Sequence, residues 1–297
     1  MKNPDLICFL VAALVLHNAV WCSAQEEAEV SLPASKEEWQ SGKALYPPDM
    51  IDIQQITYME KLDDVIIGFQ SILFSIYNLS AFTETIKRTG EDLSWAKRIL
   101  DVGTGAGPLA FLALAYGADY VIGTDIDPWA IKNARYNAKR LGLEDKFEAR
   151  LVPMSDTGAF SVIGGEEKFD LIMIDPPQDF SVNRQSPAWY HSLRSAKKNF
   201  YANDPGGKLL VSLMAGLKDH LTENGRVWVS LRTPSAQELI YEEAKEYGLN
   251  IRIIFDGRQD IDYSKVQFLT PLPPKNPKFH DGVMRMTYVK VYEVTVP

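Results

Sequence analysis

The sequence has very little cysteine. Of its 297 residues only Cys8 and Cys22 are cysteines, and both lie within the first two dozen residues. If that segment is removed as a targeting peptide, the mature chain has no thiol. This excludes a disulfide framework, a cysteine nucleophile and thiolate ligands for a metal, and we assign no metal site.

The sequence also lacks a long hydrophobic run near its start. The apolar stretch Ile7–Leu16 is too short for a comfortable membrane span. Lys2 precedes it, and the small residues Cys22–Ala24 offer a cleavage site before Gln25. We therefore expect residues 1–24 to be a signal peptide and the protein to be secreted or in the secretory pathway, the periplasm if it is bacterial. The alternatives are an uncleaved segment that anchors the chain in a membrane, or a misassigned start.

Positive charge is scarce as well. Lys and Arg number 31 against 39 Asp and Glu, which gives a formal net charge of −8. The average field of such a protein repels a polyanion such as RNA or DNA. The nearest thing to a basic patch is the short cluster Arg194–Phe200, which is typical of a solvated helix face. Charge therefore disfavours a nucleic-acid substrate.

The first third of the chain divides into three parts. Residues 25 to about 48 are polar and acidic, which indicates a loose lead-in. Over Thr57–Asn78 apolar residues recur every three or four positions, a spacing that predicts a helix with one buried face. A second, short helix is expected over Phe82–Arg88. The lead-in and this helical extension make up residues 25–95, and the main domain is expected over 96–297.

Strand and helix patterns alternate in the main domain, with short connections. The expected strands are Arg98–Val102, Tyr120–Asp125, Lys146–Val152, Phe169–Ile174, Arg226–Leu231, Asn250–Phe255 and Val283–Val296. The expected helices are Pro108–Tyr116, Trp129–Leu141, Leu209–Leu221 and Ala236–Tyr247. This alternation predicts an α/β fold with a doubly wound, seven-stranded, mostly parallel sheet covered on both faces. Ligands bind beyond the carboxyl ends of such strands, so the loops there should share one rim.

The loop after the first of these strands is rich in glycine. In the stretch ILDVGTGAGPLAFLALA, Gly103, Gly105 and Gly107 alternate with small residues before a helix. Alternating glycines let the backbone approach a ligand closely, and the N-terminus of a helix favours negative or polar groups. Gly105-x-Gly107-x-x-Ala110 even matches the relaxed dinucleotide fingerprint.

Two residues beside this loop favour a different ligand. Asp101 lies at the end of the strand, where a carboxylate repels a pyrophosphate but suits a cationic group. Pro108, at the expected start of the helix, removes one of the N–H donors that a phosphate would use. The loop therefore indicates a ligand that is not simply a dinucleotide.

Aspartates also follow the next two strands. Asp125 ends the second strand, about twenty residues past the glycines, where a carboxylate can bind both hydroxyls of a ribose. Asp127 with Pro128 is typical of the cap and first turn of the next helix. Asp156 follows the third strand, and it either accepts a hydrogen bond from an adenine amino group or is an ordinary exposed loop residue.

The fourth strand leads to a rigid corner. It is largely apolar and delivers Asp175 to the rim, and Pro176 and Pro177 stiffen the segment after it. The Asp175 carboxylate and the Pro176 carbonyl can together accept two hydrogen bonds from one amine or amide nitrogen and so orient its lone pair. A rigid turn with no chemical role is the alternative.

The motifs ILDVGTGAG, VIGTDIDPWAIKNARYNA and FDLIMIDPP, in this order, resemble those of the class I S-adenosylmethionine-dependent methyltransferases. The resemblance covers about Ala96–Ser230. Within that class the chain is most similar to small-domain enzymes with an Asn/Asp-Pro-Pro loop. These include the glutamine methyltransferases of release factors and several guanine and adenine N-methyltransferases, so a nucleic-acid acceptor is possible by motif although charge disfavours it.

The resemblance implies a role for each residue. Asp101 and the three glycines would hold the methionine part of S-adenosylmethionine, Asp125 the ribose and Asp156 the adenine. The residues that would meet the acceptor, and so be catalytic, are Asp175, Pro176 and Pro177. Methyl transfer needs alignment and exclusion of water more than strong acid or base groups. The implied function is methylation of a nitrogen in a protein side chain, a peptide or a small molecule.

One position departs from the family pattern. An aromatic residue usually follows the second proline and stacks on a planar acceptor, but here it is Gln178. Either Phe180, Trp189 or Tyr190 replaces it from the following insertion, or the acceptor is not a planar base. The later part of that insertion, Gln185–Gly207, is expected to form a lid over the acceptor. His191 within it is either a base or an ordinary surface residue.

Two other functions stay open. A nicotinamide-dependent oxidoreductase can be built on a similar sheet, but no second nucleotide fingerprint is visible. A cofactor-binding module without turnover would keep the glycines and Asp125, and Gln178 is the only hint of a degenerate acceptor loop. Because S-adenosylmethionine is made in the cytosol, a secreted enzyme would also need a supply of its cofactor.

Overall fold

Seven strands form the main sheet of the structure, a computed structural model that describes residues 53–59, 61–62, 64–69, 76–90, 92–178, 204, 207–258, 266–268 and 288–297. The strands are β3 (Ile99–Val102), β4 (Val121–Asp125), β5 (Phe147–Leu151), β6 (Phe169–Ile174), β7 (Leu221–Leu231), β8 (Asn250–Arg258) and β10 (Tyr288–Thr295). Their order is β5-β4-β3-β6-β7-β10-β8. Neighbours from β5 to β7 are parallel, and β10 is antiparallel to both of its neighbours. The predicted doubly wound, mostly parallel sheet is confirmed.

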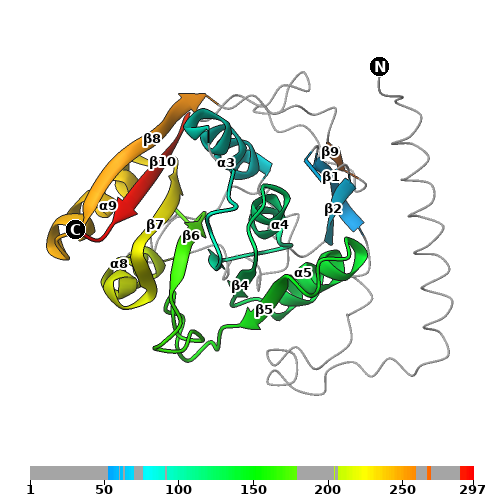
Figure 1. Cartoon of the computed structure of the whole chain (residues 1–297), viewed down its shortest axis with the longest axis horizontal. Coiled ribbons are helices and arrows are strands. Elements are labelled where there is room, and N and C mark those ends of the chain that lie inside the picture. Colours follow the sequence, from blue (N-terminus) through cyan, green and yellow to red (C-terminus); the bar gives the residue numbers. More distant parts are fainter. Residues whose placement is uncertain are drawn as a thin grey trace, which may run out of the picture. The chain divides into compact units, whose positions relative to one another are not determined.

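Helices cover both faces of this sheet (Figure 1). They are α3 (Ile76–Thr89), α4 (Pro108–Ala115), α5 (Pro128–Arg140), α8 (Lys208–His220) and α9 (Pro234–Glu246). Leu100 of β3 shares one buried cluster with Leu213 of α8 and Ile240 of α9. On the opposite face Phe82 of α3 stacks on Trp228 of β7, with 6.5 Å between the ring centroids. The strands are thus apolar on both faces, as expected for a parallel sheet between two helical layers.

The predicted helix over Thr57–Asn78 is wrong for its first part. Residues Ile53–Met59 and Asp64–Phe69 form strands β1 and β2, which pair antiparallel, and a bond from the Leu62 N–H to the Met59 carbonyl (3.1 Å) lies in the connection. The short strand β9 (Val266–Phe268) pairs with the other edge of β1. β-branched residues in β2 favour a strand, and their spacing also fits a helix, so the pattern alone is ambiguous.

The second predicted helix is confirmed and is longer than expected. It is α3, which begins at Ile76, six residues before the expected Phe82. The strand predicted to start at Arg226 begins at Leu221, and Gly225 lies where its register with β6 shifts. A Cβ at Gly225 would come within 2.7 Å of the Phe169 carbonyl, so the glycine permits the close approach of the two strands. The boundaries proposed at residues 24 and 95 stay predictions.

Candidate functional site

The candidate site lies at the carboxyl edge of the main sheet. The chain leaves β3 for β4 on one side and later returns to β6 on the other side, and such a reversal opens a crevice beyond the strand ends. Asp101 lies in β3, Asp125 ends β4, and Asp175 directly follows β6. Burial is the main cause of the raised pKa of Asp101, and the negative charges of Asp125 and Asp175 add to it. The structure therefore brings together three of the predicted carboxylates.

Backbone hydrogen bonds shape the glycine loop between β3 and α4. The N–H groups of Gly103 and Thr104 both donate to the Thr124 carbonyl, at 2.8 and 2.9 Å. Gly103 has a φ of 75° and Gly107 one of 91°, in the left-handed region that favours glycine. A Cβ at Gly107 would overlap the ring of Phe111, whereas a Cβ at Gly103 would meet nothing within 4 Å. Packing therefore requires the third glycine, and the first leaves its backbone uncovered.

Asp101 is buried beneath this loop, and one of its two carboxyl oxygens accepts hydrogen bonds. Its Oδ2 accepts from the Thr104 hydroxyl at 2.8 Å and from the Ala110 N–H of α4 at 3.2 Å. Its Oδ1 is buried and has no hydrogen-bond partner among the described residues. Burial raises the pKa of Asp101 to about 7. A buried carboxyl oxygen without a donor is costly, and it marks a place where a ligand donor is favourable.

Asp125 is held by two backbone donors. Its Oδ2 accepts from the Gly105 N–H and its Oδ1 from the Asp127 N–H, both at 2.9 Å. Burial raises the pKa of Asp125. Asp127 itself accepts from the Trp129 N–H at 2.9 Å and caps α5, so the interpretation of Asp127 as a capping residue is confirmed.

Asp156 lies in the connection from β5 to β6 and is exposed. Its Oδ1 accepts from the Gly158 N–H at 3.3 Å, a bond within the loop. The Ala159 N–H donates to the Ser212 hydroxyl of α8 at 3.0 Å, which fixes the loop on that helix. The structure thus places Asp156 after β5, as predicted, with its carboxylate open to solvent.

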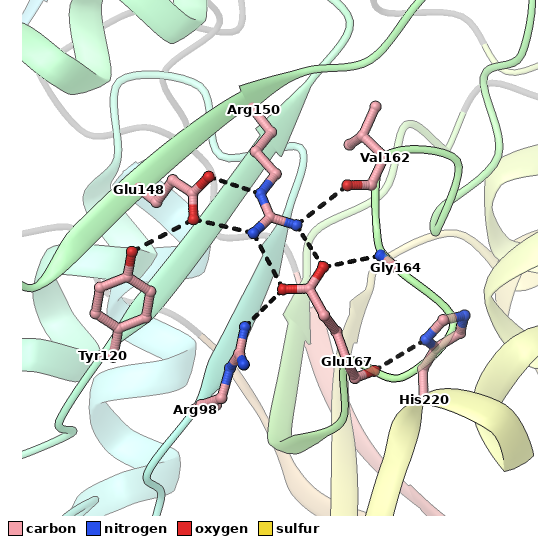
Figure 2. A network of polar contacts seen from close by, with 8 residues as sticks. All are labelled: Arg98, Tyr120, Glu148, Arg150, Val162, Gly164, Glu167 and His220. Atoms are coloured by element: carbon pink, nitrogen blue, oxygen red, sulfur yellow. Dashed lines mark hydrogen bonds and ion pairs between the residues drawn. The ribbon is translucent and has the colours of Figure 1, made fainter.

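A network of charged side chains fastens the same connection to the edge strand (Figure 2). Arg150 of β5 binds Glu148 of the same strand and Glu167 of the connection, with its shortest contacts to them at 2.9 and 2.6 Å. Arg150 also donates to the Val162 carbonyl at 3.1 Å. Glu167 accepts from the Gly164 N–H at 2.8 Å. The loop that carries Asp156 is therefore held at several points.

Asp175 has two partners, and both contact its Oδ1. The Gln178 amide donates at 3.5 Å, and a guanidinium nitrogen of Arg232 lies 3.6 Å away. The Asp175 side chain is only 15% exposed. Burial raises the pKa of Asp175 to about 6, and the charge of Arg232 opposes that rise. Among the described residues, Oδ2 has no hydrogen-bond partner.

Gln178 ties the proline corner to the turn between β7 and α9. Its Oε1 accepts from the N–H groups of Arg232 (2.6 Å) and Thr233 (3.1 Å). Its Nε2 donates to the Ser230 carbonyl at 3.2 Å as well as to Asp175. Gln178, at the position where the resemblance leads us to expect an aromatic ring, is thus engaged with backbone and does not present a flat face.

Sequence reasoning missed two residues of this site, Thr104 and Arg232, and it singled out Gln178 without its contacts. Thr104 satisfies Asp101, and a Cβ at Gly123 would come within 2.7 Å of its hydroxyl oxygen, so that glycine makes room for it. Arg232 directly follows β7 as Asp175 follows β6, and the same strand-end rule points to it. No local sequence pattern predicts the contacts of Gln178. Phe180 and the predicted lid residues Trp189, Tyr190 and His191 lie outside the described residues.

A model of the family described as ribosomal protein L11 methyltransferase (PrmA) matches residues 81–174. This match includes the glycine loop and the candidate site residues Asp101, Asp125 and Asp156, and it ends one residue before Asp175. The chain is 54% identical over 57 residues to the ribosomal protein L11 methyltransferase of Photobacterium profundum, which is 19% of each chain. It is 46% identical over 74 residues to that of Geobacter metallireducens, 25% of this chain and 24% of the relative. The match thus spans about a fifth to a quarter of these relatives' length.

A solved structure of the ribosomal protein L11 methylase of Lactobacillus delbrueckii subsp. bulgaricus is similar over 74% of this chain and 80% of its own, with 18% identity and a TM-score of 0.44. The relatives contradict the expectation of a secreted protein, because they are named for the methylation of a ribosomal protein, a part of the translation machinery. Within the described part of the chain, no helix has the length and apolarity to cross a bilayer.

Proposed function

We propose that this chain, which belongs to the class I S-adenosylmethionine-dependent methyltransferases, transfers a methyl group to a nitrogen of a protein side chain. The observation that carries the proposal is the meeting of three carboxyls, the buried Asp101 and the partly buried Asp125 and Asp175, around a glycine loop at one strand edge. No strong acid or base is needed in such a site, because alignment and exclusion of water make up most of the catalysis.

The residues present fit S-adenosylmethionine. The unpartnered Oδ1 of Asp101 suits the ammonium of its methionine part, and the uncovered backbone at Gly103 permits close approach. Asp125 is fixed by two backbone donors and keeps lone pairs for the ribose hydroxyls, and the open carboxylate of Asp156 suits the adenine amino group. When bound, the cofactor supplies a methyl carbon activated by a positively charged sulfur.

The corner at Asp175 and Pro176 supports a nitrogen acceptor. The carboxylate and the adjacent carbonyl each accept one N–H, which fixes the nitrogen and turns its lone pair toward the crevice. Pro177 continues the stiff segment and limits its freedom to move. These residues orient the acceptor and hold its N–H groups at stated atoms, and the proton released on methylation leaves to solvent.

The acceptor we favour is an aliphatic amine of a protein. Gln178 uses both ends of its amide on backbone groups and on Asp175, so a planar base gains no stacking partner at this position. Among the described residues, the crevice carries the three carboxyls of Asp101, Asp125 and Asp175 beside the guanidinium of Arg232, which favours a basic acceptor over a phosphate-bearing one. The matched relatives are named for a protein substrate, ribosomal protein L11, which we take as the first acceptor to test.

The experiment is binding followed by transfer, with the full chain. Calorimetry should show that S-adenosylmethionine and S-adenosylhomocysteine bind and that NAD does not. Bacterial ribosomal protein L11 and methyl-labelled cofactor should then give methylated L11 by mass spectrometry. Asp175→Asn should bind the cofactor but transfer at least tenfold more slowly. Binding of NAD alone would overturn the class of cofactor, whereas cofactor binding without transfer to L11 would overturn only the acceptor.

A further inference from the structure

Resting on the proposed function, we propose that Arg232 and Gln178 are positioning residues that hold Oδ1 of Asp175 and so assign Oδ2 to the acceptor N–H. Both side chains contact the same oxygen of the Asp175 carboxylate. Gln178 Nε2 and the Arg232 guanidinium both approach Oδ1, at 3.5 and 3.6 Å, and no described residue contacts Oδ2. A carboxylate held through one oxygen presents the other in one direction, which is what orienting an acceptor nitrogen requires.

Gln178 is itself fixed by hydrogen bonds, so it can hold the Asp175 carboxylate in a defined position. The two backbone N–H groups of Arg232 and Thr233 fix its Oε1, and the Ser230 carbonyl shares its Nε2. The amide therefore cannot turn without losing bonds at both ends. Ser230, Arg232 and Thr233 lie at the end of β7 or directly after it. Because β7 pairs with β6, the sheet fixes the position of Gln178 and, through it, that of Asp175.

Arg232 adds a second effect, because it keeps the Asp175 carboxyl ionised in a crevice of like charges. Burial raises the pKa of Asp175 and the charge of Arg232 opposes it. Among the described residues, Asp101 lies near enough to Asp175 to feel its charge: burial is the main cause of the raised pKa of Asp101, and the charge of Asp175 adds to it. Without Arg232, Asp175 would hold a proton near neutral pH and would no longer accept from an amine at Oδ2.

The test is a carboxyl ¹³C NMR titration of the full chain, with Asp175→Asn to assign the signal. In Arg232→Gln the titration midpoint of Asp175 should rise by about one pH unit or more, and in Arg232→Lys by less. Gln178→Glu, which keeps the two bonds at Oε1 but replaces the donor by a carboxylate, should also raise it. Arg252→Gln removes an ion pair with Glu293 on β10 and is the matched control, with no shift expected at Asp175.

Two further readouts separate positioning from simple structural support. S-adenosylhomocysteine should bind Arg232→Gln within about twofold of the wild type, because the contacts are on the acceptor side. With L11 as acceptor, the acid limb of the kcat/KM profile should move up by the same shift as the NMR midpoint. An unchanged Asp175 midpoint in Arg232→Gln and in Gln178→Glu would overturn the inference. Failure of S-adenosylhomocysteine to bind the wild type would instead overturn the proposed function.

Discussion

The guanidinium of Arg150 binds both oxygens of the Glu167 carboxylate, at 2.6 and 3.1 Å. Arg98 adds a bond to the same carboxylate at 2.7 Å. The Arg150 and Glu167 side chains are only 21% and 22% exposed. Two-point pairs of this kind are stronger than typical surface ion pairs, because their geometry is fixed and their solvation is reduced. The pair therefore supports the connection that carries Asp156.

Removing this pair should destabilise the protein. We expect Glu167→Gln to lower the free energy of unfolding by about 1–3 kcal/mol, because charge-assisted bonds to two arginines are lost. The exposed neighbour Glu166 provides the control, and Glu166→Gln should change stability by less than about 0.5 kcal/mol. Urea unfolding of both variants measures the difference. Equal effects would mean that the ion pair contributes nothing beyond an ordinary surface charge.

The same pair predicts a pH dependence of definite sign. Hydrogen bonding from Arg150 lowers the pKa of Glu167 from 4.5 to about 2. The stabilisation from the ionised carboxylate is complete above the unfolded value and is lost as pH falls toward the folded one. The stability advantage of the wild type over Glu167→Gln should therefore shrink between about pH 5 and about pH 3. Urea unfolding at several pH values tests this, and a constant advantage would contradict it.

The main sheet could be predicted because its signals are local. A strand buried on both faces is a continuous apolar run, such as Phe169–Ile174, and helix starts carry an Asp-Pro or Thr-Pro pair, as at Asp127–Pro128 and Thr233–Pro234. The hairpin of β1 and β2 could not be predicted in this way. Its apolar spacing fits a helix too, and its partner β9 lies far along the chain.

The residues of the candidate site also fall into two groups, those that local sequence signals predict and those that they do not. The carboxylates at strand ends follow from chain order alone, because parallel strands deliver their next residues to one edge. Arg232 meets Asp175, and Gln178 meets the end of β7, only because β7 pairs beside β6, with Ile174 opposite Val229. Strand order within a sheet is a tertiary property that no local pattern contains. The roles of Asp101, Asp125 and Asp156 toward a cofactor stay predictions, which variants of single residues can test.

Asp125 and Asp127 are two residues apart, and substitution of each should affect a different property of the protein. Asp125→Ala removes a carboxylate that faces the glycine loop, and we expect S-adenosylmethionine affinity to fall about tenfold to a hundredfold. Asp127→Ala removes the cap of α5 and should cost about 1 kcal/mol of stability with little change in affinity. Calorimetry and urea unfolding on both variants give the comparison. Loss of affinity in Asp127→Ala alone would reverse the assignment.

Gly103 and Gly107 give a second contrast. Gly107→Ala places a Cβ inside the Phe111 ring at a positive φ, so we expect a loss of stability of about 2 kcal/mol or more. Gly103→Ala has open space around the new Cβ and should cost only about 1–2 kcal/mol of backbone strain. If Gly103 lines the cofactor site, that small variant should still weaken S-adenosylhomocysteine binding at least tenfold. Normal binding by folded Gly103→Ala would place the cofactor elsewhere.

The buried Asp101 carboxyl should make cofactor binding depend on pH. Its pKa of about 7, raised by burial, means that it is largely neutral near pH 6 and ionised near pH 8. A ligand ammonium favours the ionised form, so affinity for S-adenosylhomocysteine should rise about tenfold between those values. Asp101→Asn should bind weakly at both, with a flat profile. Calorimetry across this pH range provides the measurement.

Stability without ligand should move in the opposite direction. A carboxyl whose folded pKa lies above its unfolded value takes up a proton on folding, so stability falls as pH rises from about 4 to about 7. Asp101→Asn should remove that slope and become relatively more stable toward pH 8. Asp175, with a pKa of about 6, titrates in the same range, so Asp175→Asn must be measured beside it. If Asp101→Asn keeps the wild-type slope and Asp175→Asn loses it, the titrating group is the acceptor carboxyl, and Asp101 is not the residue that responds to the ammonium.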